Sequence, residues 1–244
     1  MKTTIVGLPV CVGGREEVLR ECMRLVGRGG LVFTLNALMC ERAMRSGSFA
    51  NTLRGADVLT VDGVGVKALL RLRGVRTDTL VGVELGEELL REGEHTVALI
   101  GGIEGVAERA MAHLLAINPA LRPAFAVSGF GHTEEEYISL VRTHTPDVVL
   151  VCLGSPRQES LAARLRAESE KTLFLALGGS LDIYSGSKRR APLFMRRLGL
   201  EWLFRTISEP HRIKELPRLV AFLLCAPKMA KNQQKTENAK QKIP

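Results

Sequence analysis

Short apolar runs alternate with amphipathic stretches along the chain as far as residue 177. Compact apolar runs bounded by turn residues predict buried strands, whereas apolar positions three and four apart predict helices. The predicted strands cover residues 4–10, 31–35, 58–61, 97–100, 124–127, 148–153 and 173–177. The predicted helices cover residues 15–26, 65–72, 85–91, 106–117, 134–142 and 158–167.

Strands that take turns with helices favour β-α-β crossovers, and so a mostly parallel sheet. The sequence therefore predicts an α/β fold, Rossmann-like, with helices flanking the sheet. In such sheets ligands bind beyond the carboxyl ends of the strands. Polar residues and glycines gather at those ends: Thr34, Asn36, Asp62, Gly63, Gly101, Gly102, Gly129, Gly154, Gly178 and Gly179. A glycine there also serves a tight turn, and that alternative stays open for each one.

After residue 190 the pattern changes to helices only, which are predicted over residues 200–207 and 212–224. The most apolar window there, residues 219–226, is eight residues long, whereas a membrane-spanning helix needs about 20. We expect an α/β domain over residues 1–190, a helical C-terminal appendage over 191–228 and a disordered basic tail over 229–244. A C-terminal helix packed on the core, followed by a loose tail, is the alternative.

The 244 residues suffice for one α/β domain with a small appendage, and 45% apolar residues supply a buried core. Five cysteines, an odd number without C-x-x-C pairing, indicate neither a disulfide framework nor a zinc site. The first seven residues hold one lysine and no long apolar core, so a secretory signal is not expected. These features are typical of a cytoplasmic protein.

The positive charge is confined to the C-terminal quarter. Residues 188–244 hold fourteen Lys or Arg and four Glu, which leaves −2 for residues 1–187 out of a net charge of +8. A one-sided basic segment favours an anionic partner, either nucleic acid or a membrane surface. Nucleic acid is the weaker interpretation, because the aromatic residues of this segment form no recognisable RNA-binding motif.

Seven short motifs follow one another along the chain: Thr34-Leu35-Asn36, Asp62-Gly63-Val64-Gly65, Gly154-Ser155-Pro156-Arg157-Gln158-Glu159, Gly178-Gly179-Ser180-Leu181-Asp182, Arg190-Ala191-Pro192, Glu201-Trp202-Leu203-Phe204-Arg205 and Glu209-Pro210-His211-Arg212. In this order and spacing the chain resembles the WecG/TagA/CpsF glycosyltransferase family, which builds bacterial surface polysaccharides on lipid carriers. The resemblance covers nearly the whole chain.

The resemblance implies an inverting glycosyltransferase of the GT-E kind that needs no metal and no cofactor. It would move a hexose, foremost N-acetylmannosamine, from a UDP-sugar to N-acetylglucosamine on a polyprenyl diphosphate, for surface polysaccharide or teichoic acid. The expected location is the inner face of the cell membrane, with the appendage docked on anionic lipid and completing the active site. A homo-oligomer stays open. A uronic-acid or glucose donor is the alternative, and a sugar carboxylate would call for an additional buried arginine.

Sugar transfer requires that an acceptor hydroxyl lose a proton and that the leaving diphosphate be stabilised. Asp62 is the candidate base, because it follows a predicted strand and precedes Gly63 and Gly65, which let backbone approach a ligand. The matching aspartate is the proposed base of the family. The alternative is that Asp62 caps the helix that begins near Gly65.

By the same resemblance Thr34 and Asn36 line the donor-sugar pocket, and Thr34 is expected to be a catalytic residue together with Asp62. The side chains of Thr34 and Asn36 both donate and accept hydrogen bonds. Gln158 is expected to contact the nucleotide at a helix N-terminus, and Asp182 to hydrogen-bond uracil or ribose. Glu159 is expected to offset the helix dipole.

The chain contains no Asp-x-Asp pair and no His/Cys cluster at ligand spacing, so arginines are expected to neutralise the diphosphate in place of a metal. Arg190, Arg205 and Arg212 match family positions, and a guanidinium fork pairs well with phosphate oxygens. Arg205 also lies four residues after Glu201, so a structural ion pair is the alternative for it.

One position departs from the family. The family usually has Arg-x-Thr-Gly where this chain has Thr79-Leu80-Val81-Gly82, so the donor-binding arginine is absent, and Arg76 is the candidate substitute.

Two other classes of function are alternatives. An NAD-binding oxidoreductase predicts G-x-G-x-x-G after a strand, but Gly63-Val64-Gly65 is followed by Val66-Lys67-Ala68. A basic adaptor without catalysis would leave the motifs of the first 187 residues unexplained.

Overall fold

The computed structural model describes residues 1–225, and a six-stranded parallel sheet in the order β4-β3-β8-β7-β5-β6 forms its centre. The strands are β1 Lys2–Ile5, β2 Leu8–Cys11, β3 Gly30–Leu35, β4 Val58–Val61, β5 Thr96–Gly101, β6 Arg122–Val127, β7 Val148–Cys152 and β8 Leu173–Ala176. The helices are α1 Arg15–Met23, α2 Ala37–Arg45, α3 Gly47–Arg54, α4 Val64–Leu72, α5 Gly82–Leu90, α6 Val106–Ile117, α7 Glu134–His144, α8 Arg157–Glu168, α9 Ser180–Tyr184, α10 Leu193–Arg197, α11 Glu201–Ser208 and the 3₁₀ helix η1 Pro210–Glu215. A last helix covers residues 216–225.

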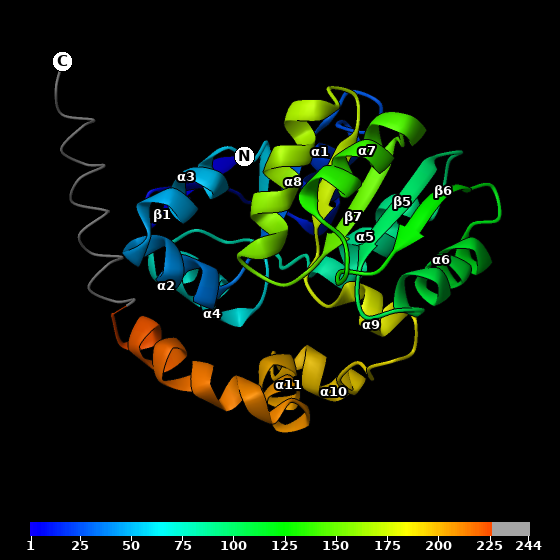
Figure 1. Cartoon of the computed structure of the whole chain (residues 1–244). Coiled ribbons are helices and arrows are strands. Elements are labelled where there is room, and N and C mark those ends of the chain that lie inside the picture. The colour runs from blue at the N-terminus through cyan, green and yellow to red at the C-terminus, as the bar shows by residue number, and fades with distance from the viewer. Residues whose placement is uncertain (226–244) are drawn as a thin grey trace, which may run out of the picture.

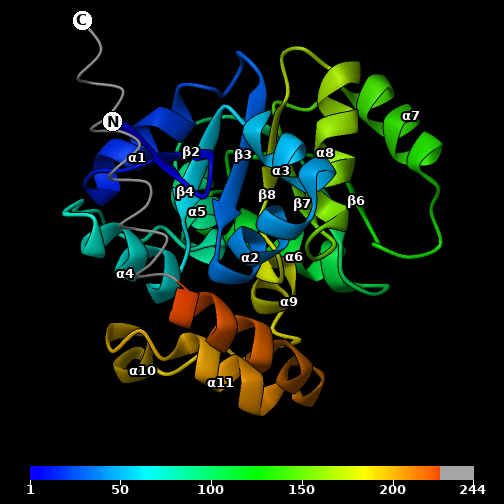
Figure 2. The same cartoon turned by 90° about the vertical axis from the view of Figure 1, so that its left-hand side faces the viewer.

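The sheet is buried on both faces, because alternate side chains of each strand enter different apolar clusters. In β3, Phe33 and Leu35 pack with residues of α2, α3, α7 and α8, whereas Val32 packs with residues of α1, α5, α6 and α9. Figures 1 and 2 show helices on both sides of the strands. The predicted α/β fold with a parallel sheet is confirmed.

The predicted strand over residues 4–10 is wrong. The chain forms the antiparallel hairpin β1-β2 there, outside the six-stranded sheet. Its two-residue turn consists of Val6 and Gly7, whose φ angles are 46° and 74°. Two consecutive positive φ angles suit the right-handed twist of a hairpin, and Gly7 was the signal in the sequence.

Four helices were not predicted: α2, α3, α9 and α10. The first two are short and are separated by Ser46, which ends α2 and whose hydroxyl accepts from the N–H of Phe49 to begin α3. The helix predicted to start at residue 85 begins at Gly82 instead. Short capped helices carry too few turns for a clear apolar period.

The helices predicted after residue 190 are confirmed as α11 and the helix over 216–225, the second preceded by η1. Figures 1 and 2 show this C-terminal segment, residues 191–225, beside α4 and α9. Phe222 enters the core cluster of α2 and α3. Gly65 packs against Ala37 and Leu223, because a β-carbon added to Gly65 would lie 2.9 Å and 3.9 Å from them.

Within residues 1–225 no helix combines the length and the apolar character needed to cross a bilayer. Residues 226–228 of the predicted appendage and the tail predicted over 229–244 lie outside the described residues.

Candidate active site

A cavity of about 160 Å³ opens beyond the carboxyl ends of β3, β4 and β8. β3 and β8 are neighbours, but the chain leaves them for helices on opposite faces of the sheet, α2 and α9. A crevice forms at such a switch point, which is where open α/β sheets bind ligands. Residues of the central domain and of the C-terminal segment line it: Thr34, Asn36, Leu38, Met39, Arg42, Asp62, Gly82, Val83, Gly154, Ser155, Gln158, Leu177, Gly178, Gly179, Ser180, Arg205 and Glu215.

Asp62 lies in this cavity directly after β4, and its backbone N–H donates to the carbonyl of Leu35 at 2.9 Å. Its carboxylate has no hydrogen bond or ion pair within the described part of the chain, and no side chain caps α4, so the capping alternative is not observed. Enclosure by protein raises the pKa of Asp62 to about 6, while the positive charge of Arg205 lowers this pKa and Glu201 raises it. The carboxylate is therefore mostly ionised near neutral pH and able to accept a proton.

Thr34 and Asn36 line the same cavity and also have structural contacts. The hydroxyl of Thr34 donates to the carbonyl of Ala176 at 3.5 Å, across the gap between β3 and β8. The side chain of Asn36 accepts from the N–H of Met39 at 3.0 Å and caps α2. The amide nitrogen of Asn36 is left for a ligand.

Gln158 joins two loops of the cavity wall. Its Oε1 accepts from the N–H groups of Gly154 at 3.1 Å and Gly178 at 3.0 Å, and its Nε2 donates to Oε1 of Glu159 at 2.8 Å. Glu159 is fully buried, and burial raises the pKa of this carboxyl although the Gln158 hydrogen bond lowers it. Glu159 therefore holds the amide of Gln158, in addition to lying in the first turn of α8.

The two glycines after Asp62 differ in their surroundings. Gly63 has a φ of 83°, and a β-carbon added there would meet nothing within 4 Å. Gly65 packs inward against Ala37, as described above. A ligand could therefore approach the backbone closely at Gly63, as expected. Gly65 instead allows α4 to pack closely against α2.

Asp182 lies on α9 and does not line the cavity. Its carboxylate pairs with Nζ of Lys188 at 3.0 Å, and Lys188 also pairs with Glu209 at 3.3 Å. The predicted contact of Asp182 with uracil or ribose stays a prediction, and it would require this ion pair to rearrange.

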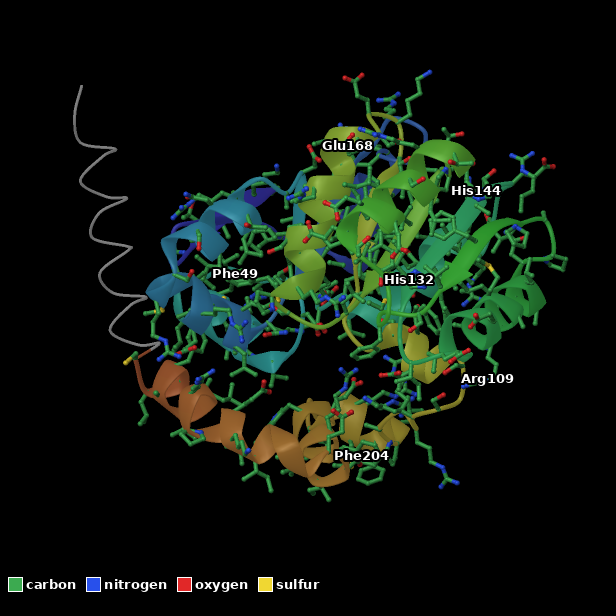
Figure 3. The ribbon with its side chains drawn as sticks, in the orientation of Figure 1. Phe49, Arg109, His132, His144, Glu168 and Phe204 are labelled. Carbon is green, nitrogen blue, oxygen red and sulfur yellow. The ribbon has the colours of Figure 1, made fainter. Side chains whose placement is uncertain are left out.

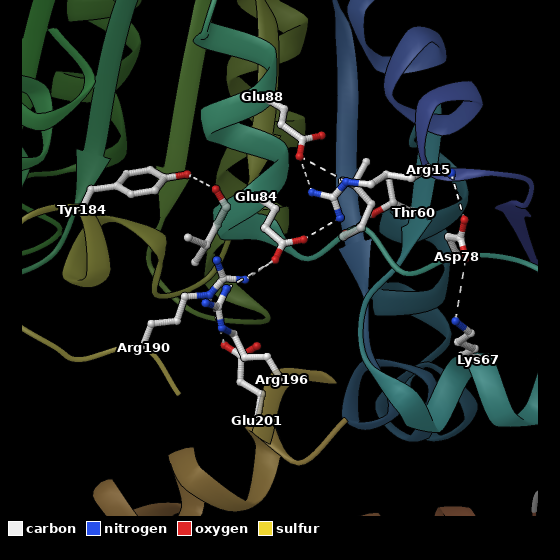
Figure 4. A network of polar contacts seen from close by, with 12 residues as sticks. Arg15, Thr60, Lys67, Asp78, Glu84, Glu88, Tyr184, Arg190, Arg196 and Glu201 are labelled. Atoms are coloured by element: carbon white, nitrogen blue, oxygen red, sulfur yellow. Dashed lines mark hydrogen bonds and ion pairs between the residues drawn. The ribbon is translucent and has the colours of Figure 1, made fainter. Parts of the chain in front are cut away.

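Arg190 belongs to a charge network around Glu84 (Figure 4). Glu84 accepts from Arg190 at 2.5 Å and from Arg15 at 2.6 Å, and Arg196 lies 3.9 Å away. Burial by itself would raise the pKa of Glu84, but the hydrogen bonds from Arg15 and Arg190 outweigh it and lower that pKa. This network attaches the start of the C-terminal segment to α5.

Arg205 lines the cavity and pairs with Glu201 at 2.9 Å, so both of its predicted roles are compatible with the structure. After burial, the positive charge of Arg205 has the largest effect on the pKa of Asp62. The side chain of Arg212, the third predicted phosphate ligand, lies outside what the structure describes.

Motif reasoning assigned no role to four polar residues of the cavity wall: Arg42, Ser155, Ser180 and Glu215. Arg42 lies on α2, a helix that was not predicted, about one and a half turns after the motif Thr34-Leu35-Asn36. This spacing was the signal for it in the sequence. Arg76, the candidate substitute for the missing arginine, is exposed and does not line the cavity. Thr79 is half-buried and is likewise outside the cavity wall.

In the described part of the chain, no three His, Cys, Asp or Glu side chains come together as metal ligands. Figure 3 shows His132 and His144 well apart; His132 precedes α7, and His144 ends it. The cysteines within residues 1–225 are free thiols.

The family model for the glycosyl transferase WecG/TagA/CpsF family matches residues 3–236. A Staphylococcus aureus (strain MW2) protein named N-acetylglucosaminyldiphosphoundecaprenol N-acetyl-beta-D-mannosaminyltransferase is 28% identical over 213 residues, which are 86% of this chain and 83% of that protein. A Bacillus subtilis (strain 168) protein of the same name is 28% identical over 209 residues, 84% of this chain and 82% of that protein. These findings decide against the oxidoreductase and adaptor alternatives, and the chain belongs to the WecG/TagA/CpsF family of glycosyltransferases.

Proposed function

We propose that this protein transfers N-acetylmannosamine from a UDP-sugar to N-acetylglucosamine on undecaprenyl diphosphate. The single observation that carries the proposal is the cavity at the switch point, which holds an unpaired carboxylate, Asp62, beside the arginine Arg205. The names of the two relatives state this donor sugar and this acceptor for those proteins.

In the proposed reaction Asp62 takes the proton from the acceptor hydroxyl. The oxygen of that hydroxyl attacks the anomeric carbon of the donor sugar at the same time. The bond between that carbon and the diphosphate oxygen breaks on the opposite side, so the configuration inverts and UDP leaves with the bonding electrons. A base whose pKa lies near the working pH suits this step, because it is ionised before attack and still accepts a proton readily.

The leaving UDP gains negative charge that the protein has to stabilise. Arg205 already lies in the cavity wall, and Arg190 is held next to it through Glu201, which is 4.0 Å from Nε of Arg190 and 2.9 Å from Arg205. Guanidinium groups would supply the positive charge that other nucleotide-sugar enzymes take from a metal.

The C-terminal segment is proposed to dock on the inner face of the membrane. Large apolar side chains of α10, α11 and their connection are exposed, with Phe194 at 65%, Leu198 at 68% and Ile207 at 70%. The same segment carries Arg197, Lys214 and Arg218. Exposed apolar side chains beside basic ones suit an interface-bound helical segment, with about 1 kcal/mol of attraction to anionic lipid per basic residue. The segment would then bring Arg205 to a lipid-linked acceptor.

The test is an assay of UDP release and of glycolipid product with UDP-N-acetylmannosamine, UDP-glucose and a UDP-uronic acid, each with polyprenyl-diphosphate N-acetylglucosamine. Product from UDP-N-acetylmannosamine, and faster turnover than with the other two donors, supports the proposal. Preferential use of the uronic acid or of glucose contradicts the donor, and no transfer from any of them contradicts the function.

A further inference from the structure

Arg42 is a cavity-lining cation, and its positive charge acts on the buried carboxyl of Glu159, whose pKa it lowers. Arg42 lies on α2, half-buried, and makes no ion pair within the described part of the chain. The nearest acid along the helix, Glu41, pairs instead with Arg45 at 2.6 Å. The guanidinium carbon of Arg42 lies 5.9 Å from the centre of the Phe49 ring, which supports it from α3 (Phe49 is labelled in Figure 3).

The other charged residues that line the cavity are Arg205, Asp62 and Glu215. Arg205 is paired with Glu201, and Asp62 is the unpaired carboxylate of the proposed base. A buried or half-buried arginine is normally paired, because a charge taken out of water costs free energy unless a partner compensates it. An arginine left unpaired in a ligand cavity therefore indicates an anionic group in the ligand.

We propose that Arg42 binds the diphosphate of the nucleotide donor; this inference rests on the proposed function. A planar guanidinium can pair with two phosphate oxygens at once. Arg42 then supplies the positive charge that is missing because Thr79 stands where the family usually has an arginine. Arg76, the candidate substitute from the sequence, does not line the cavity.

The diphosphate is preferred over a carboxylate on the donor sugar. Every candidate donor carries the diphosphate, whereas only a uronic-acid donor carries the carboxylate. The described cavity offers the diphosphate just one other cation, Arg205, and that one already has Glu201 as a partner. The test below separates the two anions, because UDP contains the first and lacks the second.

The experiment measures the binding of UDP and of uridine by calorimetry to the full-length wild type, to Arg42→Gln and to Arg45→Gln. Arg45 is the matched control, since it lies on the same helix, pairs with Glu41 and does not line the cavity. Loss of a charge-assisted contact is expected to weaken UDP binding by about 10- to 100-fold in Arg42→Gln. Uridine binding is expected to stay within about twofold of wild type, and Arg45→Gln to bind both ligands normally.

Unchanged UDP binding in Arg42→Gln would overturn the inference and favour a sugar carboxylate. An equal loss for UDP and uridine would also overturn it, because Arg42 would then act on the shape of the cavity. If Arg42→Gln does not fold, Arg42→Lys takes its place in the test. Lysine keeps the positive charge but lacks the planar guanidinium that pairs with two phosphate oxygens, so we expect UDP binding between that of wild type and that of Arg42→Gln. A wild type that binds no UDP refutes the proposed function together with this inference, whereas UDP binding without sugar transfer refutes the proposed function alone.

Discussion

The side-chain amide of Gln158 donates to Glu159 at 2.8 Å while its oxygen accepts two backbone N–H groups, from Gly154 and Gly178. Because backbone N–H groups only donate, the oxygen of Gln158 must face the glycines, and its nitrogen must face a carboxylate. This pair connects the loop after β7 to the loop after β8, which together form one wall of the cavity.

Exchanging the two side chains tests this connection. Gln158→Glu alone places two carboxylates about 3 Å apart in a buried site, where one of them has to bind a proton. We expect a loss of about 2–3 kcal/mol of stability and a fall in Tm of roughly 5–10 °C at pH 8. The double variant Gln158→Glu/Glu159→Gln restores a donor opposite an acceptor at the same net charge, and most of the Tm should return. A double variant as unstable as Gln158→Glu would show that the amide direction is not what matters.

Asp62→Asn keeps the size of the proposed base and removes its ability to accept the proton. We expect turnover to fall by about 10²- to 10⁴-fold with the fold and UDP binding retained. Steady-state kinetics with saturating donor and acceptor, beside UDP calorimetry, make the measurement. Near-normal turnover in this variant would remove Asp62 from the role of base.

The same residue should make stability depend on pH. Burial raises the pKa of Asp62 from 3.8 to about 6, so the folded protein holds the proton more tightly than the unfolded chain. The resulting stabilisation is complete below pH 4 and is lost as the pH rises through 6. Asp62→Asn has no such proton, so its stability relative to wild type should increase by about 2–3 kcal/mol between pH 4 and pH 7. Chemical denaturation at several pH values measures it, and a constant difference between the two proteins would contradict the pKa shift.

Transfer activity should survive chelation by EDTA. The charge on the leaving diphosphate is proposed to be met by Arg42 and Arg205, and the described residues offer no cluster of three metal ligands. The control is a metal-dependent glycosyltransferase in the same buffer. Activity that disappears with EDTA and returns with added Mg²⁺ or Mn²⁺ would refute the arginine account.

Docking of the C-terminal segment predicts that Ile207→Glu weakens sedimentation with anionic vesicles but leaves turnover of a water-soluble acceptor unchanged. Met23→Glu is the control, because Met23 is 43% exposed and ends α1 at the opposite edge of the sheet, before β3. Vesicle binding of the wild type should fall at high salt as the lipid charge is screened. Equal vesicle binding by both variants would contradict docking through this face.

Truncation separates the roles of the segment from those of the tail. Ending the chain before Arg190 should lower both vesicle binding and catalysis, since Arg205 is lost, while ending it after Lys228 should leave turnover of a soluble acceptor largely intact. Turnover by the shorter chain at the rate of the full one would make the arginines membrane anchors only, and Arg42 and Arg76 would be the next to test for the diphosphate.

The parallel α/β architecture and the motifs at the strand ends could be predicted from the order of residues alone, because apolar periodicity and strand-terminal polar residues are local properties. The sequence placed Asp62, Thr34 and Gln158 at one edge of the sheet, and the structure has all three in one cavity. The hairpin at Val6 and Gly7 escaped it, because two positive φ angles in a short apolar run leave little trace in the pattern.

The pairing of charged side chains became visible once the chain was folded. Arg190 with Glu84, Asp182 with Lys188 and Gln158 with Glu159 were not predicted as pairs. Arg42 stood among 34 Lys and Arg residues with no motif to single it out. A charged side chain selects its partner by distance and burial once distant segments pack together, and neither quantity can be read from the order of residues.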